Sequence, residues 1–164
     1  MFVGGVRGRT EEAVNFYTSV FPDAEVGDVV RYGTGEEPDQ EGTIKHASFT
    51  LAGQEFAAMD SARDHSFGFN EAISFMVGCD TQDEIDHYWD SPSAVPEAEQ
   101  CGWRKDEFGV SWQIVPSILG ELLGGGTEEQ TARVTEAFLQ MKKFDIAELK
   151  RTYERAEARA GGGR

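Results

Sequence analysis

The stretch that decides the fold occurs twice, as Thr10-Glu-Glu-Ala-Val-Asn-Phe-Tyr17 and as Thr81-Gln-Asp-Glu-Ile-Asp-His-Tyr88. Each copy begins with Thr, has a β-branched residue four positions later and ends with Tyr. A Thr followed by acidic residues is typical of a helix start, and the apolar spacing puts the β-branched residue and the Tyr on one face. The repeat therefore predicts two equivalent amphipathic helices.

The residues around each copy predict how the two helices start and stop. Thr10 and Thr81 are suited to the N-cap position, and Glu84 stands at the capping-box position. Each helix runs into a proline, Pro22 in the first copy and Pro92 in the second, where it is expected to end.

Strand patterns flank both predicted helices in the same order. In the first half they cover residues 1–6, 24–32, 44–51 and 54–60. In the second half they cover residues 72–79, a weak segment near Ser93, 101–105 and 110–115. Both halves read β-α-β-β-β, which predicts an α+β fold in which two βαβββ modules form a cupped mixed sheet.

The predicted modules span residues 1–62 and 69–116, and a C-terminal helical extension covers 117–160. Amphipathic patterns in the extension predict helices at 118–123, 127–144 and 145–160, with the glycines 124–126 ending the first. We expect these helices to cover a sheet edge or to pack on a second subunit, within a single compact domain overall.

The composition limits the partners and the compartment. The 164 residues carry a net charge of −15, which repels phosphate backbones and argues against nucleic acid and anionic membranes as partners. No apolar stretch is long enough to span a membrane and no secretory signal is recognisable, so we expect a cytoplasmic protein. Many carboxylates with little Lys suit solubility in concentrated salt and suggest a halophilic source, for which the melting temperature should rise with KCl.

Strand alternation divides the predicted sheet into an apolar face and a mixed face. The apolar face, with residues such as Phe49, Ile73, Phe75 and Trp112, is expected to pack on the helices. Small uncharged polar groups on the mixed face suit a pocket for a hydrophobic or aromatic molecule, with an ordinary solvated face as the alternative. The predicted pocket residues are His46, Ser48, Asp60, Phe69, Ser74, Met76, Trp103, Ser111 and Gln113.

Four runs, residues 11–23, 71–75, 101–116 and 140–146, resemble the PhnB-like proteins. These proteins are often labelled the 3-demethylubiquinone-9 3-methyltransferase family, within the vicinal-oxygen-chelate (glyoxalase and bleomycin-resistance) superfamily. The resemblance covers nearly the whole chain and implies paired βαβββ modules and a homodimer.

The resemblance also implies where a cofactor would bind. Superfamily enzymes hold a divalent metal with His, Glu or Gln, but the matching positions fall near Phe2, Met59 and Ala72, which cannot ligate. Only Gln113 matches, and one amide oxygen cannot hold a cation against water. No Gly-rich strand-to-helix turn suits S-adenosylmethionine either. We therefore expect no cofactor, while a divalent metal held by other residues stays open.

Three functions follow from these observations, and the catalytic residues of any enzyme remain unknown. We favour metal-independent binding of a small hydrophobic or aromatic molecule. The second is a lyase, isomerase or dioxygenase with a rearranged metal site near His46, Asp60 and Gln113. The third is methyl transfer to a quinone-like phenol, as the family label states.

Overall fold

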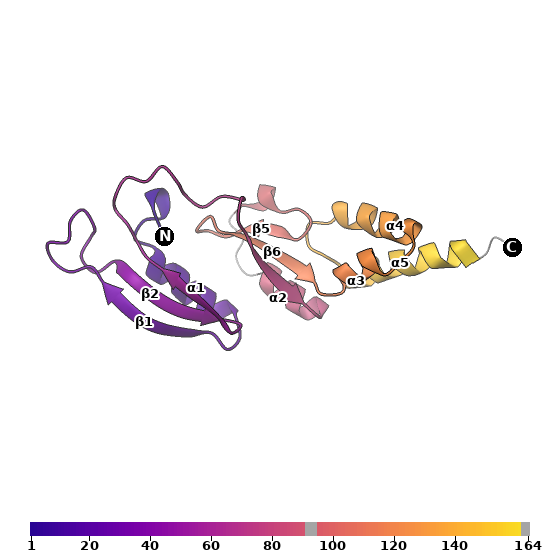
Figure 1. Ribbon diagram of the computed structural model, residues 1–164, viewed down its shortest axis with the longest axis horizontal. Coiled ribbons are helices and arrows are strands. Elements are labelled where there is room, and N and C mark those ends of the chain that lie inside the picture. Colours follow the sequence, from indigo (N-terminus) through magenta and orange to yellow (C-terminus); the bar gives the residue numbers. More distant parts are fainter. Residues whose placement is uncertain (91–94, 162–164) are drawn as a thin grey trace. The chain divides into compact units, whose positions relative to one another are not determined.

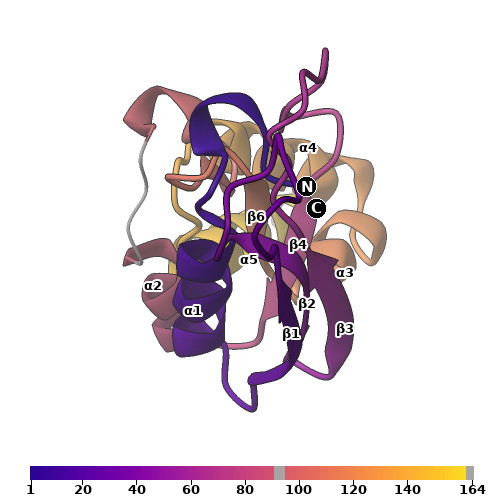
Figure 2. The same cartoon turned by 90° about the vertical axis from the view of Figure 1, so that its left-hand side faces the viewer.

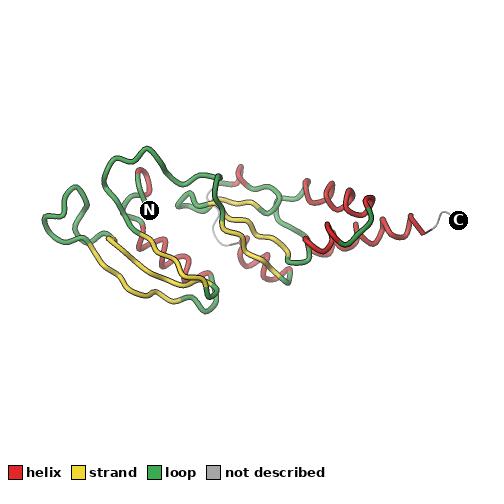
Figure 3. The backbone as a smooth tube through the Cα atoms, in the orientation of Figure 1, coloured by secondary structure: helices red, strands yellow, loops and turns green. Residues whose placement is uncertain are grey.

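The structure, a computed structural model, describes residues 1–90 and 95–161 and divides the chain into two compact units, Met1–Phe69 and Asn70–Arg164 (Figure 1). Each unit combines a three-stranded sheet with helices, as the backbone trace in Figure 3 shows. This confirms the predicted α+β class. The boundaries 1–62, 69–116 and 117–160 and the single compact domain stay predictions.

The first unit is an antiparallel sheet covered by one helix. Its strands are β1 (Glu25–Arg31), β2 (Ile44–Leu51) and β3 (Gln54–Ala58), in that order across the sheet. The helix α1 (Thr10–Val20) contacts β1 and β2 and lies against one face of this sheet (Figure 2). Ala47, Phe49 and Leu51 of β2 are buried, as are Val14 and Tyr17 of α1, so alternation identified the core side correctly.

The predicted first strand, 1–6, is reduced to a single bridge. Phe2 pairs in parallel with Asp60, where the Phe2 N–H donates to the Met59 carbonyl oxygen at 2.8 Å. Residues Gly4–Val6 form a short 3-10 helix instead. The strand prediction was wrong after Phe2 because Gly4 adopts a φ of +58°, which turns the backbone out of the extended conformation.

The second unit resembles the first, with one strand before its helix and two described strands after it. Its sheet has the order β4 (Phe75–Cys79), β6 (Ser111–Pro116), β5 (Trp103–Lys105), with β4 parallel to β6 and β5 antiparallel to it. The helix α2 (Gln82–Asp90) contacts β4 and β6. In both units the residues before the helix pair in parallel with the end of the unit's last strand region, through the bridge from Phe2 to Asp60 in the first and through β4 and β6 in the second.

The segment between α2 and β5 is described in part. Pro96–Ala98 form a second short 3-10 helix, η2. The predicted stop at Pro92 and the weak strand near Ser93 lie outside the described residues.

The two Thr residues of the repeat start their helices differently. The Glu84 N–H donates to the Thr81 hydroxyl at 3.2 Å, and the Thr81 N–H donates to the Glu84 carboxylate at 3.0 Å, which confirms the capping box. Thr10 is instead the first residue of α1, and Arg9 occupies the N-cap. The N-cap prediction for Thr10 was wrong because its hydroxyl donates to the buried Asp60 carboxylate at 2.8 Å.

The C-terminal extension consists of α3 (Leu119–Gly124), α4 (Glu128–Leu139) and α5 (Ile146–Gly161). The helix α4 ends five residues before the predicted limit of 144. It stops early because the following carbonyl groups turn toward the second sheet. Those of Met141 and Lys142 accept hydrogen bonds from the N–H groups of Cys101 and Gly102, both at 2.8 Å.

A side chain of α2 also binds the extension. The Gln82 amide nitrogen donates to the Phe144 carbonyl oxygen at 3.1 Å, and its amide oxygen accepts from the Ile146 N–H at 3.0 Å. The Gln82 side chain therefore gives hydrogen-bond partners to one backbone carbonyl before α5 and to one backbone N–H in the first turn of α5.

Candidate functional site

The sheet of the second unit has one packed face and one open face. On β6 the side chains of Trp112 and Ile114 are buried, whereas Gln113 between them is half-buried. Because side chains alternate along a strand, Ser111 and Gln113 lie on the face opposite to Trp112 and Ile114. We call this side the mixed face; its residues are Ser74, Met76, Trp103, Lys105, Ser111 and Gln113.

Three predicted site residues form a row across the mixed face. Met76 of β4 and Trp103 of β5 are both register partners of Gln113 on β6, so the three side chains lie side by side. The Met76 side chain is 65% exposed. The Gln113 amide nitrogen donates to the Ser74 hydroxyl at 2.8 Å, which fixes the orientation of the amide at the centre of the row.

A second pair of side chains extends the mixed face. Lys105 of β5 is the register partner of Ser111 on β6. The Lys105 ammonium pairs with the Glu71 carboxylate, and this hydrogen bond holds the pKa of Glu71 below its usual range. Sequence reasoning missed Lys105, although strand alternation from Trp103 places it on the same face.

Ser111 is the exceptional residue of this pair. Its side chain is buried, and its Oγ has no hydrogen-bond partner among the described residues. Buried polar atoms in native proteins nearly always have a partner, so this hydroxyl needs an explanation.

The first unit has a mixed face of its own on β2. His46 is exposed, and its register partner on β1, Val30, is 49% exposed. The hydroxyl of Ser48 accepts a hydrogen bond from the Asp28 N–H at 2.9 Å. A Cβ at Gly27 would approach that hydroxyl to 2.5 Å, so β1 lies unusually close to Ser48.

Asp60 is buried inside the first unit and holds three segments together. Its Oδ1 accepts from the Gly8 N–H and the Thr10 hydroxyl, both at 2.8 Å, and its Oδ2 accepts from the Ile44 N–H at 3.0 Å. It also borders a polar cavity of about 170 Å³ that Arg7 helps to line. The carboxylate therefore has a structural role.

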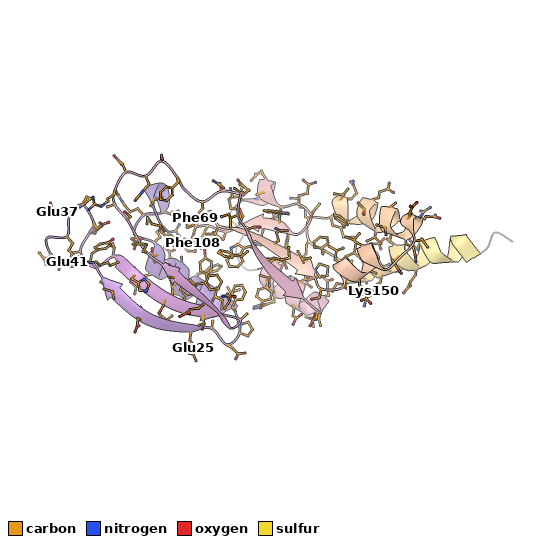
Figure 4. All side chains as sticks on the ribbon, viewed as in Figure 1. Glu25, Glu37, Glu41, Phe69, Phe108 and Lys150 are labelled. Atoms are coloured by element: carbon orange, nitrogen blue, oxygen red, sulfur yellow. The ribbon has the colours of Figure 1, made fainter. Side chains whose placement is uncertain are left out.

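Phe69, the last residue of the first unit, packs edge-on against another aromatic ring. Its ring centroid lies 5.3 Å from that of Phe2, with the planes at 77°. Phe69 is labelled among the side chains in Figure 4. The side chain is 37% exposed, so part of it is available on the surface of this unit.

The apolar face of β4 differs from the prediction. Ile73 is 77% exposed and Phe75 is 40% exposed, although both were expected to pack on a helix. Ile73 is exposed because the strand begins only at Phe75, which leaves Ile73 in the preceding turn. Phe75 still contacts the Trp112 ring, with centroids 5.2 Å apart.

The family label raises the question of S-adenosylmethionine. The glycine run at 124–126 ends α3 and precedes α4, so it does not connect a strand to a helix. Among the described residues, β4 with β6 is the one ladder of parallel strands, so the doubly wound sheet of a nucleotide-binding site is not formed. The described residues do not fit this cofactor at the glycine run.

Among the residues whose side chains the structure describes, no three His, Cys, Asp or Glu side chains come together as metal ligands. The expectation that the chain needs no metal stays a prediction. Within the same residues, no helix is both long and apolar enough to cross a membrane.

Comparison with known proteins identifies the family. The sequence model of the 3-demethylubiquinone-9 3-methyltransferase family matches residues 1–115. The chain belongs to this family. The PhnB protein of Bacillus cereus is 41% identical, with a TM-score of 0.58 over 67% of this chain and 92% of that chain. This confirms the predicted PhnB-like resemblance.

A more distant structure shares the fold alone. A protein from Pseudomonas aeruginosa is 17% identical, with a TM-score of 0.51 over 67% of this chain and 90% of that chain. No curated protein matches the chain.

Proposed function

We propose that this family member binds a small hydrophobic or aromatic molecule on the mixed face of the second unit. The observation that carries the proposal is the row Met76–Gln113–Trp103. A thioether and an indole flank one oriented amide, so an apolar ring would have two soft surfaces to pack on and a polar group to set its orientation.

The exposure of the row supports this function. The Met76 side chain is 65% exposed next to the register position of Trp103, so two apolar side chains are available together on this face. The buried hydroxyl of Ser111 on the same face adds a second reason, because a bound molecule would supply its missing partner.

The rest of the proposal concerns the first unit and the assembly. His46 and Ser48 belong to a second face of the same kind, and Asp60 and Phe69 support that unit. We propose a cytoplasmic homodimer that needs no metal, in keeping with the family resemblance. Size-exclusion chromatography with light scattering tests the dimer, and elemental analysis of the purified protein tests the metal.

The test of binding uses a neutral fluorescent probe, N-phenyl-1-naphthylamine. Met76→Ser and Trp103→Ala should each weaken probe binding by about tenfold, since each removes one apolar surface. Leu139→Ser is the matched control, because Leu139 is 48% exposed on α4 and should leave the affinity unchanged. Melting temperatures of all variants separate lost binding from lost folding.

Other outcomes would favour other functions. Equal affinity in all three variants would exclude this face as the binding site. A stoichiometric divalent ion in the protein would favour the metal-dependent enzyme. Heat released on titration with S-adenosylmethionine would favour methyl transfer.

A further inference from the structure

The buried hydroxyl of Ser111 lies at one end of the mixed face. Ser111 is 2% exposed, and its Oγ has no partner among the described residues. Losing water without gaining a hydrogen bond is costly for a hydroxyl, so the site is incomplete as it stands. A ligand oxygen would complete it by displacing the groups that now cover the hydroxyl.

A residue that carries a cation is the neighbour of Ser111 across the sheet. Lys105 and Ser111 are register partners on neighbouring strands and share the mixed face. The Lys105 side chain is only 21% exposed, so its ammonium is held close to the sheet. Its partner Glu71 has a side chain that is 58% exposed and precedes the strand β4. Exposed ion pairs contribute little stability, so another anion can replace Glu71 at small cost.

An ammonium and a hydroxyl on register partners can each donate to one oxygen of a carboxylate. Trp103 lies two residues before Lys105 on the same strand and the same face, so a ring bound at the row Met76–Gln113–Trp103 would place a substituent near the pair. We infer that the ligand of the mixed face is an aromatic carboxylate, with its ring on Trp103 and Met76 and its carboxylate on Lys105 and Ser111. This inference rests on the proposed function.

The experiment compares two probes of equal shape and different charge. Calorimetry with the full chain should show that 1-naphthoate binds about tenfold more tightly than 1-naphthamide, because a charge-assisted hydrogen bond is stronger than a neutral one. Lys105→Met should abolish this preference by weakening 1-naphthoate binding, with 1-naphthamide unchanged within about twofold. Ser111→Ala should weaken 1-naphthoate about threefold.

The opposite effect on 1-naphthoate affinity is expected when the carboxylate of Glu71, which competes with the ligand, is removed. Glu71→Gln should strengthen 1-naphthoate binding about threefold, because it removes the anion that the ligand must displace. Lys150→Met and Glu121→Gln are matched charge controls on α5 and α3, and both should leave the two affinities unchanged. The controls matter because the net charge of −15 changes by one in every charge variant.

The outcomes separate this inference from the proposed function. Equal binding of both probes, still weakened by Met76→Ser, would overturn the aromatic carboxylate and leave the binding face intact. Failure of both probes and of the neutral naphthylamine to bind would overturn the proposed function itself. Equal losses in Lys105→Met and Lys150→Met would show a general charge effect and overturn the role of Lys105.

Discussion

The two units share a topology but stabilise it with different polar groups. In the first unit the buried Asp60 carboxylate binds the chain before α1, the first residue of α1 and the first residue of β2. In the second unit a capping box starts α2. Arg104, which is 5% exposed, donates to the Tyr88 and Trp89 carbonyl oxygens at the end of α2. The repeat thus preserved the apolar pattern and not the polar contacts.

The lengths of the first strands explain part of this difference. The second unit has a five-residue ladder between β4 and β6, which orders the chain before α2. The first unit has only the bridge from Phe2 to Asp60 at the equivalent place. The Asp60 carboxylate therefore supplies hydrogen bonds that a longer strand would otherwise make.

The largest expected effect comes from removing the carboxylate of Asp60. Asp60→Asn should lower the free energy of unfolding by about 3 kcal/mol, because either amide orientation sets an NH₂ group against backbone or hydroxyl donors. Urea denaturation measures the loss. Hydrogen exchange should show that protection falls in α1 and β2 and is retained in β6.

The control for this variant is Asp28→Asn, an exposed carboxylate on β1, which should change stability by less than about 0.5 kcal/mol. If Asp60→Asn lowered hydrogen-exchange protection equally in both units, a role of Asp60 confined to the first unit would be contradicted.

The second comparison concerns a glycine in each unit. Gly102 has a φ of +80°, and a Cβ there would lie 2.6 Å from the Ile114 carbonyl oxygen and 2.4 Å from the Phe144 ring. Gly102→Ala should therefore cost about 2–3 kcal/mol, from backbone strain and overpacking together. Gly53 of the β2–β3 hairpin has a φ of +76° and open space around it, so Gly53→Ala should cost about 1 kcal/mol. Similar losses of unfolding free energy in the two variants would show that the close contacts around Gly102 do not add to the cost of the substitution.

The third prediction concerns pH. Burial raises the pKa of the Cys79 thiol to about 11 from an ordinary value of 9.0, with Glu84 and Asp80 adding to the effect. The neutral thiol is favoured in the folded state, so its contribution is complete below pH 9 and is lost as the pH rises toward 11. The stability difference between wild type and Cys79→Ala should shrink by up to about 2 kcal/mol across this range.

Urea denaturation at pH 8, 9, 10 and 11 measures this change. If the difference in the free energy of unfolding between wild type and Cys79→Ala stayed constant across this pH range, the raised pKa of the Cys79 thiol would be contradicted.

The smallest effect is expected at the cap of α2. Thr81→Ala removes the hydroxyl that accepts from the Glu84 N–H and should cost about 1 kcal/mol. Thr10→Val should cost more, because it removes the donor to Asp60 at a fully buried position. Thermal unfolding of both variants tests this order, and a larger loss for Thr81→Ala would reverse the comparison.

Local patterns were sufficient for much of the fold. The strand 44–51 was predicted to the residue, because its alternation and the following turn are both local signals. The helix predicted to begin at 127 also starts there, and the Gln130 N–H donates to the Thr127 hydroxyl at 3.2 Å. The early end of α4 could not be predicted, because it depends on backbone groups of Cys101 and Gly102 far away in sequence.

The candidate site was predictable to a smaller extent. Alternation placed Met76, Trp103 and Gln113 on one side of their strands, and the register brings them into one row. The role of Asp60 was out of reach because two of its partners, Gly8 and Thr10, are at least 50 residues away. The unpartnered hydroxyl of Ser111 also needs three dimensions, since burial of an individual polar atom has no sequence signature.

The hydrogen bonds of Gln82, Cys101 and Gly102 have a consequence for how the protein can be cut. The family model matches residues 1–115, yet three donors of the second unit find their acceptors only at residues 141–144. A fragment trimmed to the matched region would leave those donors facing water and would expose the surface that Phe144 occupies against Gly102. The matched region is therefore shorter than the folded unit, and the chain after Pro116 is part of what the second sheet needs to stay folded.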